Sequence, residues 1–376
     1  MLVQTVPSPW RAAIVPFAAT RVVLFVFAWV SLRFKLPAPQ FWQAFPNALY
    51  LDGWARWDSG WYESIANDGY RYTPGHACNV NFFPLYSWLV GLLDLPLQSA
   101  FAPRQAFHIT GMVVSLATFY LALVGLHRLV TAQFGEKLAL RTLWLVALFP
   151  FSLFYSAVYT EGVFLALSVW AFALGAERKW AWACVLASLA AVTRTVGCLV
   201  AMGLFVAYLQ QRRWRLDRDF WWFLLTPLPL FGLLAWFWQR FGEPLPFLKL
   251  YTTVWDKRPG IGRLIDVVNS VRSPLEVPAL RFQNGVYLVV VFGAIGLSLA
   301  YARRLGLGMA LYAAVSALLV ALTGFNGAGR YMAVLFPAFV GLALLTERRG
   351  YRAVVVGFAP LLLWFTYDFA HWLHVC

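Results

Sequence analysis

The sequence predicts an all-α membrane protein that crosses the bilayer many times. Of its 376 residues, 61% are hydrophobic and only 12% are charged, whereas charged residues make up about 25% of an ordinary soluble domain. The apolar residues gather in runs of roughly helix length, and most arginines and lysines lie in short clusters between these runs. The net charge of +14 forms no continuous basic tail or face, so no nucleic-acid partner is expected. We expect one membrane-embedded domain over residues 1–376.

Eleven apolar runs are long enough, or nearly so, to span a bilayer, which takes about 20 helical residues. The first of them has no small-residue cleavage site and is interpreted as an uncleaved span. Several runs are shorter than a straight span, which predicts local bilayer thinning or helices broken inside the bundle. The eleven predicted spans are 12–32, 106–126, 142–159, 162–176, 180–193, 196–209, 220–241, 285–301, 305–325, 331–346 and 353–372.

Two long segments, 36–105 and 242–284, do not fit as simple loops between spans. The positive-inside rule places the basic clusters in the cytoplasm, which leaves both segments and the C-terminus outside. The apolar stretch 82–97 is short and is bounded by Pro84 and Pro96. If it crossed, basic clusters such as that around Arg128 would be exported, so it is predicted to be a re-entrant or surface helix. The two segments are therefore the first and second extracytoplasmic loops.

A polar stretch in the first loop combines acids, aromatic residues and a glycine turn, from Arg56 to Tyr70. If residues 59–66 form a helix, Trp57, Trp61 and Ile65 fall four apart on one face. Tryptophan prefers the boundary between membrane and water, so this amphipathic helix is expected to lie flat on the bilayer.

Asp58 directly precedes this predicted helix, and two roles are considered for it. As the N-cap of the helix it would contribute about 1 kcal/mol of stability. As a carboxylate at the membrane rim it could take a proton from a sugar hydroxyl, as a general base does. Asp52 and Asp68 are weaker candidates, since Asp68 and Gly69 resemble a turn that closes the helix.

Cations at the outer ends of spans are the second group of candidates. Arg194 interrupts an apolar run, where a charge is costly without a cavity or a partner. Glu161 lies on the same side, so the two residues either form a structural salt bridge or anchor an anionic headgroup. Arg330 follows two glycines and either snorkels to the interface or binds phosphate in bidentate fashion. In the second loop, Lys257 and Arg258 form either a phosphate clamp or a solvated turn.

Several motifs, in this order along the chain, resemble the PIG-V family of GPI mannosyltransferases and its prokaryotic relatives. They are Arg56-Trp57-Asp58-Ser59, Phe82-Phe83-Pro84-Leu85-Tyr86, Tyr159-Thr160-Glu161, Thr193-Arg194-Thr195 and Arg330-Tyr331-Met332. The resemblance covers most of the chain and implies a GT-C membrane glycosyltransferase that uses a polyprenyl-phosphate sugar, most often mannose. It places Asp58 at the position of the catalytic acid and predicts substrate contacts for residues in these motifs. The expected substrate-binding residues are Arg56, Trp57, Tyr62, Glu161, Arg194, Lys257, Arg258, Arg330 and Tyr331.

These observations together predict an inverting transfer on the extracytoplasmic side of a prokaryotic plasma membrane. Asp58 would deprotonate a hydroxyl of a lipid or glycan acceptor, and arginines would hold the phosphate that leaves. No Asp-x-Asp pair accompanies Asp58 and the four cysteines have no metal spacing, so neither a metal nor a cofactor is expected. A flippase or transporter of lipid-linked sugars would also use arginines in the membrane, but would not need an acid at the rim. A non-catalytic scaffold, in contact only with lipids and partner proteins, would need neither the arginines nor the acid.

Overall fold

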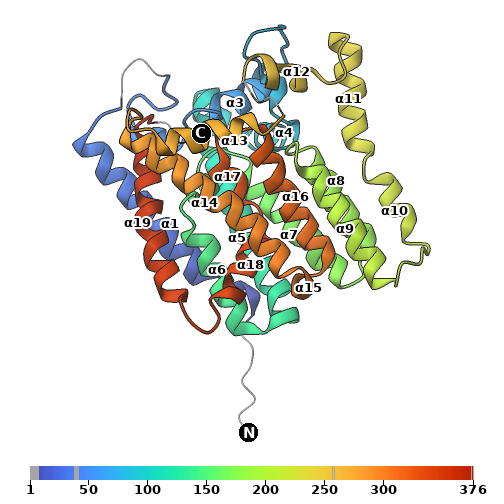
Figure 1. Cartoon of the computed structure of the whole chain (residues 1–376). Helices are drawn as coiled ribbons and strands as arrows, with labels where there is room; N and C mark the ends of the chain where they lie inside the picture. Colours follow the sequence, from blue (N-terminus) through green and yellow to red (C-terminus); the bar gives the residue numbers. More distant parts are fainter. Residues whose placement is uncertain (1–7, 38–41, 256, 258, 374, 376) are drawn as a thin grey trace.

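The computed structural model describes residues 8–37, 42–255, 257, 259–373 and 375, and within these ranges every regular element is a helix (Figure 1). The α-helices are α1 Pro9–Phe34, α2 Leu49–Asp52, α3 Ser59–Asp68, α4 Pro84–Leu93, α5 Pro103–Phe134, α6 Glu136–Leu148, α7 Glu161–Ala176, α8 Trp180–Ala191, α9 Gly197–Gln211, α10 Phe220–Leu225, α11 Leu228–Phe241, α12 Pro246–Thr253, α13 Gly262–Arg272, α14 Pro278–Ala300, α15 Ala302–Leu305, α16 Leu307–Thr323, α17 Ala328–Ala333, α18 Phe336–Leu345 and α19 Tyr351–Ala370. Three short 3₁₀ turns, η1 Asn79–Asn81, η2 Leu97–Ser99 and η3 Ser152–Tyr155, complete the described elements.

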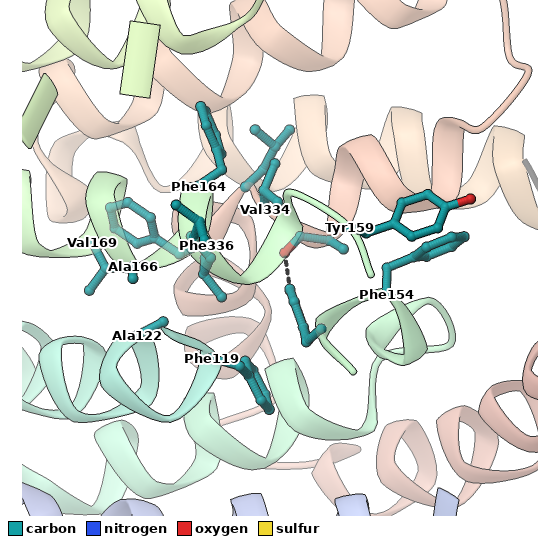
Figure 2. Close-up of a cluster of buried hydrophobic side chains, with 14 of the residues drawn as sticks. Phe119, Ala122, Phe154, Tyr159, Phe164, Ala166, Val169, Val334 and Phe336 are labelled. Atoms are coloured by element: carbon teal, nitrogen blue, oxygen red, sulfur yellow. Dashed lines mark hydrogen bonds between the residues drawn. The ribbon is translucent and has the colours of Figure 1, made fainter. Parts of the chain in front are cut away.

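The core of the bundle lies around α5 and α7, which pack closely along their length. Figure 2 shows Phe119 of α5 and Phe164 of α7 among the buried side chains of this core. A Cβ atom at Gly162 would lie 2.6 Å from the Ser115 carbonyl oxygen, so only glycine lets the two helices approach this closely. The close packing fixes the start of α7, where Glu161 lies.

All eleven predicted spans contain helix, but three of them are interrupted. In the described residues, five helical segments are long and apolar enough to cross a membrane: α1, α5, α10 together with α11, α14 and α19. The interruptions follow α6, separate α10 from α11, and separate α17 from α18. Each lies beside a proline, at Pro150, Pro227 and Pro337, because proline has no N–H to continue a helix and restricts the residue before it. Broken helices are thus confirmed, and eleven continuous helices are not what the chain forms.

Arg21 of α1 stabilises the first of these interruptions. Its side chain is 4% exposed and its guanidinium donates hydrogen bonds to the carbonyl oxygens of Ala147 and Ser152, at 3.0 and 2.7 Å. It also donates to the Ser156 hydroxyl at 3.0 Å. The Ala147 carbonyl lies in the last turn of α6, where helix carbonyls lack intrahelical partners, and it accepts the Ser152 hydroxyl as well as Arg21. Arg21 thus links the end of α6 to the start of η3.

The two long segments 36–105 and 242–284, predicted as the first and second extracytoplasmic loops, meet at one end of the bundle, which we call the loop end. Figure 1 places α3, α4, α12 and α13 together there, whereas α15, with the basic residues Arg303 and Arg304, lies at the opposite end. Helix α4 has 10 residues, so it is about 15 Å long and covers about half of a 30 Å hydrocarbon core. This length agrees with the expectation that α4 is a surface or re-entrant helix.

The aromatic face of α3 contacts protein, so the expectation that it faces the bilayer is wrong. Trp57 precedes the helix and has a φ angle of 52°, which turns it away from the helical register. Trp61 stacks on Phe82 with ring centroids 6.0 Å apart, and Ile65 is 2% exposed. The helix does end as expected, because Gly69 adopts a φ angle of 76° after Asp68.

Candidate functional site

A cavity of about 380 Å³ opens at the loop end of the bundle. Its lining combines tryptophan, phenylalanine and tyrosine side chains with a few charged groups, as in many small-molecule sites. The lining residues are Trp42, Trp57, Asp58, Trp61, Tyr62, Asn81, Phe82, Phe83, Thr160, Thr193, Arg194, Thr195, Tyr251, Trp255, Lys257, Asn326, Gly327, Arg330, Tyr331 and Trp372. Segments from most of the chain therefore meet in one place.

Asp58 is held at the wall of this cavity by its backbone and by an arginine. Its N–H donates to the Tyr159 hydroxyl at 3.1 Å, and this hydroxyl donates to the Arg56 carbonyl oxygen at 3.2 Å. The Asp58 residue occupies the N-cap position of α3, but its side chain makes no capping hydrogen bond. The carboxylate instead pairs with Arg330, with 2.5 Å between Oδ2 and Nη1. The side chain is therefore available for a role other than capping.

Arg330 reaches Asp58 because α17 packs unusually close to η3. A Cβ atom at Gly329 would lie 2.3 Å from Cδ1 of Phe151, so no larger residue fits without displacing the helix. The glycine thus permits the close approach of α17 to Phe151. The Arg330 side chain is 11% exposed and lines the cavity.

Arg194 lies in the break between α8 and α9 and pairs with Glu161. Its Nη1 is 2.5 Å from Glu161 Oε1 and donates to the Thr160 hydroxyl at 2.9 Å. The same Oε1 atom lies 3.8 Å from Nε of Arg330. Glu161 is fully buried and does not line the cavity, so it acts as a shared counter-charge behind the two arginines. The predicted salt bridge between Arg194 and Glu161 is confirmed, and Arg194 also lines the cavity.

Lys257 adds a third cation beside Tyr331. Its Nζ donates to the Tyr331 hydroxyl at 3.1 Å and lies 4.8 Å from the centre of that ring. The Arg194 guanidinium lies 5.0 Å from the same ring centre. Arg258, also predicted to bind substrate, is outside the described residues. Three cations and one carboxylate, that of Asp58, are thus the charged groups in the described lining. This excess of positive charge suits an anionic ligand such as a phosphate.

Seven of the predicted site residues line the cavity together: Trp57, Asp58, Tyr62, Arg194, Lys257, Arg330 and Tyr331. Arg56 does not. It is fully buried, forms an ion pair with Asp52, and donates to the Ala370 carbonyl oxygen at 3.1 Å. Asp52 also accepts the N–H groups of Ala44 and Phe45, at 2.6 and 2.9 Å. This pair fixes the loop that precedes Asp58, and the expected substrate contacts of Arg56 and Glu161 find no support in this arrangement.

Several lining residues were not predicted, among them Asn81, Tyr251 and Trp372. Asn81 lies just before a motif that was singled out, and an asparagine between apolar residues in an outer loop is a signal that could have identified it. Trp372 sits at the end of the last apolar run and packs edge-on against Trp57, with ring centroids 5.3 Å apart. Nothing in its local sequence distinguishes it from other tryptophans at the ends of spans.

Comparison with known proteins connects this site to a family. The family model described as Mannosyltransferase (PIG-V) matches residues 31–217, which include Asp58, Glu161 and Arg194. No curated protein sequence matches the chain.

Among solved structures, the chain is similar to ArnT from Cupriavidus metallidurans bound to undecaprenyl phosphate. The TM-score is 0.51 at 15% identity, over 92% of this chain and 63% of that one. Two further similar structures are from Archaeoglobus fulgidus. One is its oligosaccharyltransferase with zinc and sulfate, at a TM-score of 0.44 and 17% identity over 94% of this chain and 53% of that one. The other is its oligosaccharyltransferase AglB in complex with an inhibitory peptide and a dolichol-phosphate. The TM-score is 0.46 at 14% identity, over 94% of this chain and 55% of that one. This chain thus spans between half and two thirds of the length of these proteins, and its similarity to ArnT confirms the GT-C-like fold.

Proposed function

We propose that this chain, which belongs to the PIG-V mannosyltransferase family, transfers a mannosyl group from a polyprenyl-phosphate donor to a hydroxyl of a lipid-linked or glycan acceptor. One observation carries the proposal: a carboxylate, Asp58, and three cations, Arg194, Lys257 and Arg330, line the same cavity. A glycosyl transfer of this kind needs one group that accepts a proton and others that hold a departing phosphate.

The cations suit the donor because a sugar joined to a lipid phosphate carries one negative charge. As the bond between the anomeric carbon and the phosphate oxygen breaks, the phosphate gains a second negative charge. At the same time the acceptor proton moves to Asp58, whose carboxylate loses its charge. The total charge of the cavity is therefore unchanged by the reaction. Arg330 lies 2.5 Å from the Asp58 carboxylate, so its guanidinium can pair with Asp58 before the reaction and with the departing phosphate afterwards.

An inverting course is supported by the number of carboxylates. A retaining transfer by double displacement needs a nucleophile in addition to an acid and base. In the described lining Asp58 is the only carboxylate, since Glu161 is buried behind Arg194. A single base on the face of the sugar opposite the phosphate is sufficient for direct displacement with inversion. A β-linked donor would then give an α-linked product.

An extracytoplasmic active site is supported by the position of the cavity. It opens at the loop end, whereas the basic clusters that the positive-inside rule assigns to the cytoplasm lie toward the other end, as α15 does (Figure 1). In a prokaryotic cell this end would face away from the cytoplasm across the plasma membrane.

The test is transfer by the purified protein in lipid bilayers. Radiolabelled polyprenyl-phosphate mannose, its glucose analogue and a nucleotide-linked mannose are supplied separately with a lipid extract as acceptor. We expect label to appear in product only from the polyprenyl-phosphate mannose. Transfer from the nucleotide sugar alone would refute the lipid-donor proposal. Movement of intact donor across the bilayer without transfer would instead identify a flippase.

A further inference from the structure

A second cavity, of about 350 Å³, adjoins the first at the loop end. The two cavities share Trp255, Lys257 and Asn326 in their walls, so they lie next to each other. The remaining walls come from α13, from the start of α14 and from residues 323–325. This volume is within the range of about 300–1,000 Å³ that is typical of small-molecule sites.

Two neighbouring amide side chains of α14, Gln283 and Asn284, face this cavity in fixed orientations. Gln283 donates through Nε2 to the Tyr287 hydroxyl at 2.7 Å, and that hydroxyl donates to the Val375 carbonyl oxygen at 2.8 Å. Asn284 donates through Nδ2 to the Ser270 hydroxyl at 2.9 Å, and Ser270 donates to Glu276 at 3.1 Å. The first series of hydrogen bonds ends at the Val375 carbonyl oxygen and the second at the Glu276 carboxylate, which can only accept. The direction of every hydrogen bond in the two series is therefore determined.

Both amide nitrogens therefore donate hydrogen bonds within the protein, whereas the two amide oxygens are available to accept hydrogen bonds. Neither Oε1 of Gln283 nor Oδ1 of Asn284 accepts a hydrogen bond from the part of the chain that the structure describes. The Gln283 residue is only 7% exposed, but neither amide oxygen is among the buried side-chain atoms without a partner, so both oxygens are accessible to a hydrogen-bond donor that enters the cavity. Two acceptors held side by side in a cavity indicate a ligand that brings hydrogen-bond donors.

The charges of the two cavities differ. In the second, Arg263 and Asp266 pair with each other at 3.4 Å, which leaves the shared Lys257 as the excess charge in its described lining. The first holds the two arginines that suit a phosphate. An anionic group is thus drawn to the first cavity, and an uncharged group rich in hydroxyls fits the second.

We infer that the second cavity binds the uncharged, hydroxyl-rich headgroup of the acceptor, a sugar or a similar polyol. Gln283 and Asn284 accept hydrogen bonds from its hydroxyls, while one further hydroxyl extends past Lys257 into the first cavity toward Asp58. The identification of this ligand as the acceptor rests on the proposed function. The binding of a polyol does not.

The test measures binding of octyl α-mannopyranoside to the purified protein in nanodiscs, without donor, by saturation-transfer NMR titration. Gln283→Met and Asn284→Leu each remove one acceptor at little change in volume. Since one hydrogen bond to a neutral group is lost, each variant is expected to raise Kd roughly five- to tenfold. Gln98→Leu is the matched control, because Gln98 is an exposed amide of the first loop that bonds to Asp94 and lines neither cavity.

The variant Tyr287→Phe distinguishes direct ligand binding by Gln283 from a structural role of its hydrogen bonds. It removes the hydroxyl that links Gln283 to Val375 but leaves the Gln283 amide oxygen in place. It is expected to change Kd less than Gln283→Met does. No binding to the natural protein, or equal Kd values for it and both amide variants, overturns the inference even if mannosyl transfer is observed. If the glycoside binds and the amide variants weaken it, but no donor supports transfer, the polyol site stands and the proposed function fails.

Discussion

Replacement of Asp58 by asparagine tests the proposed mechanism most directly. Asparagine has almost the same shape as aspartate and preserves the backbone bond to the Tyr159 hydroxyl, which is made by the Asp58 N–H. It removes the negative charge beside Arg330 and the ability to accept a proton. The change therefore alters the chemistry at one position of the cavity wall and leaves its shape intact.

The expected size of the effect follows from the two roles of this carboxylate. A positioned general base accelerates a reaction by about 10²- to 10⁴-fold, so kcat is expected to fall by about 10²-fold or more. Arg330 keeps a second partner, since its Nε lies 3.8 Å from the Glu161 carboxylate. The arginine should thus remain in the cavity, and KM for the donor should change little.

The assay is single-turnover transfer from polyprenyl-phosphate mannose, with donor binding measured on the same protein. Near-normal turnover by a variant that still binds donor would refute the assignment of Asp58 as the base. Two other acids of the first loop are poorly placed to replace it. Asp52 is fully buried in its pair with Arg56. Glu63 bonds to Arg104 at 3.0 Å outside the cavity lining, and burial raises its pKa, an effect that the Arg104 bond opposes.

Three further outcomes are expected. Arg194→Ala and Arg330→Ala should each weaken donor binding, measured by donor titration, and lower kcat, measured by single turnover. Lysine at either position should restore function only in part, because it lacks the planar guanidinium. Equal donor affinity in all four variants would contradict a phosphate site there. Activity should survive EDTA, since side-chain cations match the charge of the phosphate, and loss that only Mg²⁺ or Mn²⁺ reverses would disprove this. Single cysteines at the exposed Thr73 and Asn269 should react with an impermeant reagent from outside, and one at Arg213 should not; labelling of all three from one side would overturn the proposed topology.

Much of the fold follows from the sequence because apolar length and proline positions are local properties. The runs that became α1, α5 and α14 are long and uninterrupted, so these helices were predicted, although α5 continues eight residues past its predicted end and α14 begins seven residues before its predicted start. The interruption after α6 depends in addition on Arg21, whose partners in Ala147, Ser152 and Ser156 lie more than a hundred residues away. The orientation of α3 also depends on distant groups, because Trp57 is placed by its contact with Trp372 near the other end of the chain.

The charged residues of the site were found because charge in an apolar chain is conspicuous. Asp58, Arg194 and Arg330 are expensive to bury and therefore suggest a partner or a ligand. Gln283 and Asn284 carry no charge and lie at the start of a span, where polar residues are ordinary. Their importance becomes visible only when the hydrogen bonds to Tyr287 and Ser270 show which amide atoms remain without a partner.

The ion pair between Asp58 and Arg330 has a consequence for the order in which substrates add. The Arg330 guanidinium pairs with Oδ2 of Asp58, an oxygen of the carboxylate that would receive the acceptor proton. A donor phosphate competes for the same guanidinium, and its arrival frees that oxygen. We therefore expect a compulsory order in which the donor binds before the acceptor, so that water or a hydroxyl compound entering an unloaded enzyme meets a carboxylate already engaged. Initial-rate patterns with both substrates varied would distinguish this order from random addition.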